Sequence, residues 1–148
     1  MIHIREATPH DIPLMMELIH ELALFEKAPE EVVMTEDALL KDGFGESPSY
    51  ICFIAEFEDK AIGMALCYVR YSTWKGRVLY LEDLIIKEAY RNKGIGSMVF
   101  EYLISFAKNS GYHRLQWQVL DWNQDAIRFY DRFHAQYDAE WLNAWVES

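Results

Sequence analysis

The stretch from Val78 to Ser97, VLYLEDLIIKEAYRNKGIGS, constrains the fold more than any other part of the sequence. It begins as an apolar strand with two carboxylates in its middle, and it then breaks at a basic loop that contains glycines. The loop leads directly into an amphipathic helical pattern. A strand followed by a Gly-X-Gly loop at a helix N-terminus offers main-chain N–H groups to an anion such as a phosphate. The stretch therefore predicts a phosphate-binding turn between a strand and a helix.

The remaining segments predict an α/β (α+β) protein that forms one domain over residues 1–148 on a mixed sheet. The expected helices start at Thr8, Thr35, the glycine loop and Asn123, and they end near residues 27, 43, 111 and 134. The expected strands are residues 2–5, 50–58, 61–71, 78–87 and 113–120, with one or two closing strands after residue 135. Residues 70–77 are expected to form a polar connection that exposes Trp74.

The composition restricts the class of partner. The 148 residues carry a formal net charge of −10, because 24 acids oppose 14 bases. This charge disfavours a nucleic acid, whose phosphates need a basic surface, and it suits a small cationic substrate, although solubility alone also explains it. The N-terminus lacks the apolar segment of a signal peptide, and no run approaches the roughly 18 apolar residues of a membrane span. We therefore expect a cytoplasmic protein that has no membrane partner.

The cysteines and histidines do not indicate a metal site. Cys52 and Cys67 lie in apolar strand-like runs without CxxC spacing, and the five histidines form no HxxxH pair. We expect both thiols to be buried as small hydrophobic side chains in a reducing compartment. The sequence therefore predicts no metal.

The loop Arg91-Asn-Lys-Gly-Ile-Gly96 combines two glycines with two cationic side chains. The missing Cβ atoms of the two glycines would allow successive N–H groups to close on an anion. A dinucleotide-binding loop of the Rossmann type is one alternative, but it would need a small residue where Val99 stands and would start directly after the strand. A helix start with incidental glycines is the other alternative.

Several motifs together resemble one family. The Arg-x-x-Gly-x-Gly loop after an apolar strand resembles the acyl-CoA signature of the GNAT N-acetyltransferases, and the helix from Asn123 to Tyr130 resembles their other diagnostic segment. The diamine (spermidine/spermine) acetyltransferase group has segments similar to ELALFEK, EDALLKDGFGE, YSTWKGR, YLEDLII, RNKGIGS and VLDWNQDAIRFY. Its thialysine Nε-acetyltransferase branch is most similar in YSTWKGR and VLDWNQ. The resemblance runs from about residue 3 to residue 135.

The resemblance implies the GNAT fold, in which a mixed, mostly antiparallel twisted sheet is splayed at the coenzyme A site and flanked by helices. It also implies acetyl-CoA as co-substrate, no metal and, together with the aromatic tail, a homodimer. Three groups of residues would then contact the coenzyme: Leu84, Ile85 and Ile86 at the pantetheine arm; Arg91, Asn92, Lys93, Gly94, Ile95, Gly96 and Ser97 at the pyrophosphate; and Asn123, Gln124, Asp125, Ala126 and Tyr130 beyond it.

Two side chains are candidates for proton transfer. Acetyl transfer needs a base for the attacking amine and an acid for the departing thiolate. Glu82 is the candidate base, because a carboxylate inside an apolar strand must be paired or line a cavity, and burial would raise its pKa. A structural salt bridge is the alternative. The resemblance places Tyr130 at the sulfur as the acid, although its helix face would also suit a core.

The neighbouring Asp83 would point to the opposite face of the sheet unless the strand is bulged. We expect Asp83 to have a structural role or to balance the charge around the substrate.

The expected acceptor is a small primary amine: thialysine, a lysine-like amino acid, or a diamine or polyamine. The resemblance places Phe25, Glu26 and Trp74, with Glu82, at the substrate, where Glu26 would attract an ammonium group and Trp74 would stack on it or anchor its loop. Ser72 stands where polyamine-specific members usually carry an acid, which favours a short amine such as thialysine or lysine. A peptide or protein lysine acceptor, and a module that binds coenzyme A without turnover, are the alternatives.

Overall fold

The computed structural model of the chain describes residues 1–148. The chain forms two compact units, residues 1–117 and residues 118–148. None of its helices combines the length and the apolar character that crossing a membrane requires.

The first unit is built on a five-stranded sheet in the order β1-β2-β3-β4-β5. Its strands are β1 (Ile2–Glu6), β2 (Ile51–Phe57), β3 (Lys60–Ser72), β4 (Gly76–Ile86) and β5 (Leu115–Trp117). The first three neighbouring pairs are antiparallel, and β4 and β5 are parallel. The prediction of a mixed, mostly antiparallel sheet is therefore confirmed.

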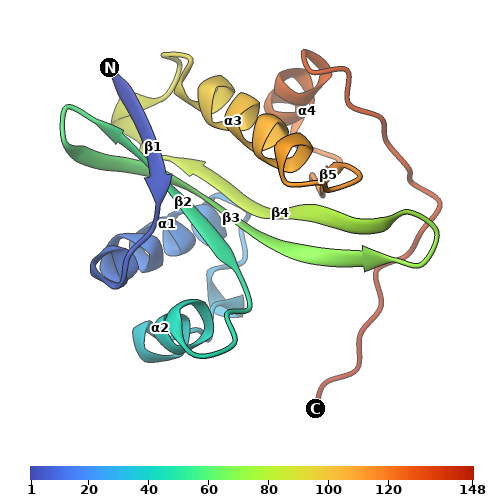
Figure 1. The fold of residues 1–148 in the computed structure, drawn as a ribbon, viewed down its shortest axis with the longest axis horizontal. Helices are drawn as coiled ribbons and strands as arrows, with labels where there is room; N and C mark the ends of the chain where they lie inside the picture. Colours follow the sequence, from blue (N-terminus) through green and yellow to red (C-terminus); the bar gives the residue numbers. More distant parts are fainter. The chain divides into compact units, whose positions relative to one another are not determined.

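Helices cover both faces of this sheet. The α-helices of the unit are α1 (Ile12–Phe25), α2 (Glu36–Phe44) and α3 (Ile95–Asn109), and short 3-10 turns are η1 (Pro9–Asp11), η2 (Pro29–Glu31) and η3 (Glu88–Tyr90). Figure 1 shows α1 and α2 on one face and α3 on the other. The predicted starts of the first two helices hold: the Asp11 carboxylate accepts a 2.7 Å hydrogen bond from the Thr8 N–H, and the Thr35 hydroxyl accepts one of 3.1 Å from the Ala38 N–H.

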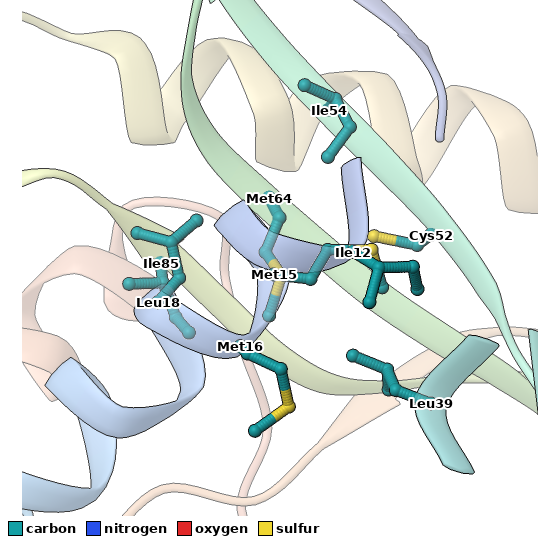
Figure 2. Packing of buried hydrophobic residues seen from close by; sticks show 9 residues of the cluster. All are labelled: Ile12, Met15, Met16, Leu18, Leu39, Cys52, Ile54, Met64 and Ile85. Carbon is teal, nitrogen blue, oxygen red and sulfur yellow. The ribbon is translucent and has the colours of Figure 1, made fainter. Parts of the chain in front are cut away.

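The core beneath α1 and α2 takes alternate residues from the central strands. Met64 of β3 and Ile85 of β4 point toward the buried side chains of α1, as Figure 2 shows. The cluster comprises Ile12, Met15, Met16, Leu18, Leu39, Cys52, Ile54, Met64 and Ile85. Cys52 and Cys67 are both buried and form no disulfide, as predicted, and burial raises the pKa of each thiol to about 12. Both thiols therefore remain protonated near neutral pH.

The opposite face packs against α3. The helix buries Ile95, Val99, Phe100, Leu103 and Ala107. The ring centroid of Phe53 in β2 lies 5.3 Å from that of Tyr102 and 5.0 Å from that of Phe106. This packing fixes the position of the α3 N-terminus beside the end of β4, where the glycine loop joins the two elements.

Three predicted segments differ from the structure. Residues 70–77 form a tight hairpin between β3 and β4, because the Ser72 hydroxyl accepts hydrogen bonds from the N–H groups of Trp74 (3.2 Å) and Lys75 (3.0 Å). The strand predicted over 113–120 shortens to β5. Residues 135–148 contain no strand, so the prediction of closing strands is wrong, and the two tryptophans of this segment, Trp141 and Trp145, are exposed.

The second unit contains one helix, α4 (Gln124–Asp131). The Asn123 side-chain oxygen accepts a hydrogen bond from the Ala126 N–H at 3.2 Å, which confirms the predicted cap. The Tyr137 hydroxyl donates to the Asp131 carboxylate at 2.8 Å and so ties the following segment to the helix.

Candidate active site

The register of the β3–β4 ladder shifts in the middle of β4. Leu66 faces Asp83 and Cys67 faces Leu81, so Glu82 is an extra residue without a partner on β3. Such a β-bulge bends its strand and changes the direction of the side chains beside it. Since the two residues of a directly opposed pair lie on one face, Asp83 shares the α1 face of the sheet with Leu66, which packs on the core beneath α1. Tyr80, three residues away, lies on that face as well, which regular alternation would not allow.

Three carboxyl groups gather at this bulge. Glu26 follows the last residue of α1, and its charge interacts with those of Glu82 and Asp83. Burial, together with the charges of Glu82 and Glu26, raises the pKa of Asp83 to about 7. Burial and the charge of Glu82 also raise the pKa of Glu26. The cluster is therefore a negative site that favours a bound cation.

The ion pairs of Arg5 do not involve the three carboxyl groups of this cluster. Arg5 of β1 pairs with Asp11 and with Glu56 of β2. The structure also contains no group of three or more His, Cys, Asp or Glu side chains placed to hold a metal ion. Carboxylates accept hydrogen bonds from an organic ammonium group, which has three donors and the opposite charge, so such a group would suit this cluster.

The positions of the two strand carboxylates correct one expectation. Glu82 is exposed, so the expectation of a buried Glu82 is wrong, and the partly buried carboxyl is that of Asp83. The sequence carried a signal for this arrangement, because two adjacent carboxylates in an apolar strand have no regular position that suits both. A bulge resolves the conflict by placing one in solvent and the other under α1.

A strip of side chains on the same face continues away from the carboxylates. Tyr68 and Tyr80 face each other across β3 and β4, and their ring centroids are 5.1 Å apart. The guanidinium carbon of Arg70 lies 5.5 Å from the centroid of the Tyr80 ring. Burial is the main cause that raises the pKa of each phenol; the charge of Glu82 adds to the shift and that of Arg70 opposes it. We call Tyr68, Tyr80 and Arg70 the tyrosine–arginine strip. Our sequence interpretation did not include it.

The other edge of β4 is paired over three residues only. Leu79, Tyr80 and Leu81 face residues 115–117 of β5 in parallel register. From residue 82 to residue 86 no strand lies along this edge, and an extended ligand that carries amides can pair there as an added strand. The predicted pantetheine contacts Leu84, Ile85 and Ile86 all lie in this stretch. One acceptor is already used, because the Arg91 Nε donates to the Ile86 carbonyl at 2.8 Å.

The loop after β4 has the backbone of an anion-binding turn. Asn92 and Gly94 adopt positive φ angles of 63° and 79°, and α3 begins at the next residue, Ile95. No side chain caps this helix, and a Cβ built at Gly94 would meet no atom within 4 Å. A phosphate beside Gly94 would therefore meet the positive end of the α3 dipole in open space. The Lys93 ammonium lies 5.8 Å from the Tyr90 ring centroid and supplies a positive charge to the same loop.

The other candidate substrate residues lie at two separate places in the first unit. Phe25 ends α1 and is half exposed, directly before Glu26. Trp74 lies at the tip of the β3–β4 hairpin with 92% of its surface exposed, as expected from the sequence. The structure therefore places Phe25 beside the carboxylate cluster and leaves Trp74 at the far end of the hairpin.

The remaining candidates belong to the second unit. Asn123, Gln124, Asp125 and Ala126 form the start of α4, where Asp125 pairs with Arg128. Tyr130 lies in the last turn of the helix and is partly buried, with its ring centroid 5.3 Å from that of Phe129 in an edge-on arrangement. Their roles toward a coenzyme remain predictions.

Comparison with known proteins gives a consistent result. The profile of the acetyltransferase (GNAT) family matches residues 15–135. The chain is 41% identical over 143 residues to the thialysine N-epsilon-acetyltransferase of Bos taurus, with 91% of this chain and 84% of that protein covered. It is 37% identical over 134 residues to spermidine/spermine N(1)-acetyltransferase-like protein 1 of Homo sapiens, and this match covers 86% of this chain and 19% of that protein.

One more distant relative and one solved structure add to this comparison. The L-ornithine N5-acetyltransferase of Arabidopsis thaliana is 28% identical over 184 aligned positions that cover 93% of this chain and 81% of that protein. An aminoglycoside N-acetyltransferase solved in complex with CoA has a TM-score of 0.78 at 17% identity, covering 100% of this chain and 96% of that one. This last likeness shows a common fold.

Proposed function

The chain belongs to the GNAT family of N-acetyltransferases, and from this premise we propose that it transfers the acetyl group of acetyl-CoA to a small primary amine. The observation that carries the proposal is the cluster of Glu26, Glu82 and Asp83 at the bulge of β4, beside the unpaired edge of the same strand. The cluster suits an ammonium group, and the edge suits an amide-containing arm. Both partners of the reaction would thus meet at one strand.

The chain's residues divide the proton transfers between them. The amine nitrogen attacks the thioester carbonyl carbon, a C–N bond forms, and the C–S bond then breaks. Glu82 takes the proton that the amine loses, directly or through a water molecule, and Tyr130 gives a proton to the departing thiolate. A main-chain N–H near Leu84 donates to the oxyanion of the tetrahedral intermediate.

The coenzyme would lie along the end of β4 and the loop that follows it. Leu84, Ile85 and Ile86 supply main-chain groups to the pantetheine arm, and the turn from Asn92 to Ser97 holds the pyrophosphate. The family resemblance also assigns coenzyme contacts to the start of α4 and to Tyr130, and we include them in the proposal. The open space beside Gly94 and the uncapped start of α3 support this placement.

The favoured acceptors are small amino acids with a terminal amine, such as thialysine, lysine and ornithine. Relatives named for thialysine and ornithine support this class, and the Ser72 hydroxyl, occupied in the hairpin turn, offers no charge to a long polycation. Polyamines are the second candidate, because one relative is named for spermidine and spermine. A peptide lysine would be the third.

A steady-state assay of free thiol release tests the proposal. The purified protein is supplied with acetyl-CoA and, in turn, thialysine, lysine, ornithine, spermidine and a lysine-containing peptide. Thiol release with the small amino acids and not with the peptide is the expected result. Tight acetyl-CoA binding without thiol release for any amine would instead identify a binding module and refute the proposal.

The role of Tyr130 has its own test. The Tyr130→Phe variant keeps the ring and removes only the hydroxyl, so we expect kcat to fall about 100-fold while the affinity for acetyl-CoA changes little. Steady-state kinetics and equilibrium binding measure the two quantities. An equal loss of both would show that Tyr130 contributes packing and not acid catalysis.

The family resemblance and the tail tryptophans Trp141 and Trp145 also support a homodimer. Sedimentation at micromolar protein concentration is expected to show a dimer, and a monomer under these conditions would contradict it.

A further inference from the structure

The tyrosine–arginine strip extends along the same sheet face as the carboxylate cluster. Tyr68 and Arg70 alternate along β3 with Leu66, whose partner on β4 is Asp83, and Tyr80 is the partner of Tyr68. Side chains at alternate positions of a strand share a face, so the strip and Asp83 lie on the α1 side. The face thus carries anions at one end and a cation at the other.

The opposite charges of Glu82 and Arg70 both act on the phenols of Tyr68 and Tyr80, which lie between them on this face. Tyr80 and Glu82 are two residues apart, which is about 7 Å along a strand. The Arg70 guanidinium does not extend away from this region, since its carbon lies 5.5 Å from the Tyr80 ring centroid. The terminal nitrogen and the carboxyl carbon of an extended lysine are also about 7 Å apart. A ligand that extends from the bulge to Arg70 would thus need a cationic group at one end and an anionic group at the other, as such an amino acid has.

Arg70 is also chemically suited to bind an anion. The ion pairs of the first unit use Arg5, whereas Arg70 contacts an aromatic ring. Stacking on Tyr80 orients the planar guanidinium and leaves its N–H edge available, and this edge matches a carboxylate in two parallel hydrogen bonds. The ring of Tyr68, which is only partly buried, would cover the methylene chain between the ends of the ligand, and the buried Tyr80 supports the guanidinium from below.

We propose that Arg70 binds the carboxylate of an amino-acid acceptor whose terminal amine lies at Glu82, and that it selects such acceptors against diamines and polyamines. A diamine of the same length would bring a second ammonium group to Arg70, and the two like charges would repel each other. This inference rests on the proposed acetyltransferase function and specifies its substrate class.

The test compares matched acceptors in matched variants. Lysine and thialysine are each paired with the diamine that lacks only the carboxylate, and kcat/KM is measured for every acceptor. The Arg70→Met variant keeps an unbranched apolar side chain over Tyr80 and removes the guanidinium. Its ratio of kcat/KM for amino acid over diamine is expected to fall at least tenfold, with partial recovery in Arg70→Lys.

Arg77 supplies the control. It lies in the same hairpin with its guanidinium carbon 4.6 Å from the Tyr112 ring centroid, but its ladder position, opposite Tyr71, puts it on the other face of the sheet. Arg77→Met therefore removes an equally exposed stacked arginine without touching the strip, and its ratio is expected to stay within twofold of the wild-type value.

A second measurement uses the wild-type protein alone, so that it does not depend on the folding of a variant. The methyl esters of lysine and thialysine lack the carboxylate charge, and each is expected to lose at least tenfold in kcat/KM relative to the free amino acid. Equal use of ester and acid, an unchanged ratio in Arg70→Met, or the same fall in Arg77→Met would each overturn the inference. Absence of thiol release with every wild-type acceptor would instead refute the proposed function and this inference with it.

Discussion

The two halves of β4 differ in how completely the strand is paired and buried. Residues 78–81 are at most 5% exposed, and β3 and β5 pair with both edges of this half at residues 79–81. Residues 82–86 start at a bulge, lack a neighbour on the β5 edge and include two carboxylates. A strand that is fully paired builds a core, and one whose ladder is interrupted offers its side chains and main chain to ligands. The bulge at Glu82 marks the change from one role to the other.

Truncation of one leucine side chain in each half of β4 should give the largest difference in the free energy of unfolding. Leu79 is fully buried, so Leu79→Ala is expected to lower the free energy of unfolding by about 2–5 kcal/mol. Leu84 is only partly buried, so Leu84→Ala should cost clearly less. Urea unfolding followed by circular dichroism measures both. Equal losses would mean that the second half is as much a part of the core as the first.

Replacement of Asp83 sharpens the comparison at the bulge. The pKa of Asp83 is raised from 3.8 to about 7, so between these pH values the folded protein holds a proton that the unfolded chain has lost. Wild-type stability should therefore fall as pH rises through this window. Asp83→Asn removes the ionisable group. The free energy of unfolding of this variant is expected to exceed that of the wild type by roughly 1–3 kcal/mol at pH 8, with little difference at pH 4.

Asp11 is the control for the direction in which stability changes with pH, because hydrogen bonds from Arg5 lower its pKa. Its contribution is present above the unfolded-state pKa and is lost as pH falls through the folded-state pKa, so Asp11→Asn should destabilise the protein at pH 8. Urea unfolding at several pH values follows both variants. If Asp83→Asn were also less stable than the wild type at pH 8, the ionised Asp83 would stabilise the fold, which would contradict this account.

The sequence predicted those features that depend on neighbouring residues. Caps at Thr35 and Asn123 need only a side chain and an N–H three residues later, and both are present. The strands along the chain followed from apolar runs, and the turn before α3 followed from Gly94 and the residues beside it; phosphate binding by this turn stays a prediction. The family resemblance added the contacts of the pantetheine arm and of Asn123 to Tyr130, which no local pattern assigns and which stay predictions.

Register could not be predicted in the same way. The bulge at Glu82 is a property of the pairing between β3 and β4, and neither strand reveals it alone. Without it, Asp83 was expected on the opposite face, and Glu82 was expected to be buried. The position of Arg70 over Tyr80 likewise depends on the ladder, because the two residues are ten positions apart in sequence and belong to different strands.

The central claim is that the exposed carboxylate of the bulge, Glu82, accepts the proton of the acceptor amine. The most direct test is the pH profile of kcat/KM for thialysine in the wild type and in Glu82→Gln, each at saturating acetyl-CoA. We expect the variant to lose about 100-fold in kcat/KM and to have a flattened acidic limb, because glutamine cannot accept the proton of the amine. An acidic limb of unchanged position and depth in Glu82→Gln would contradict the claim.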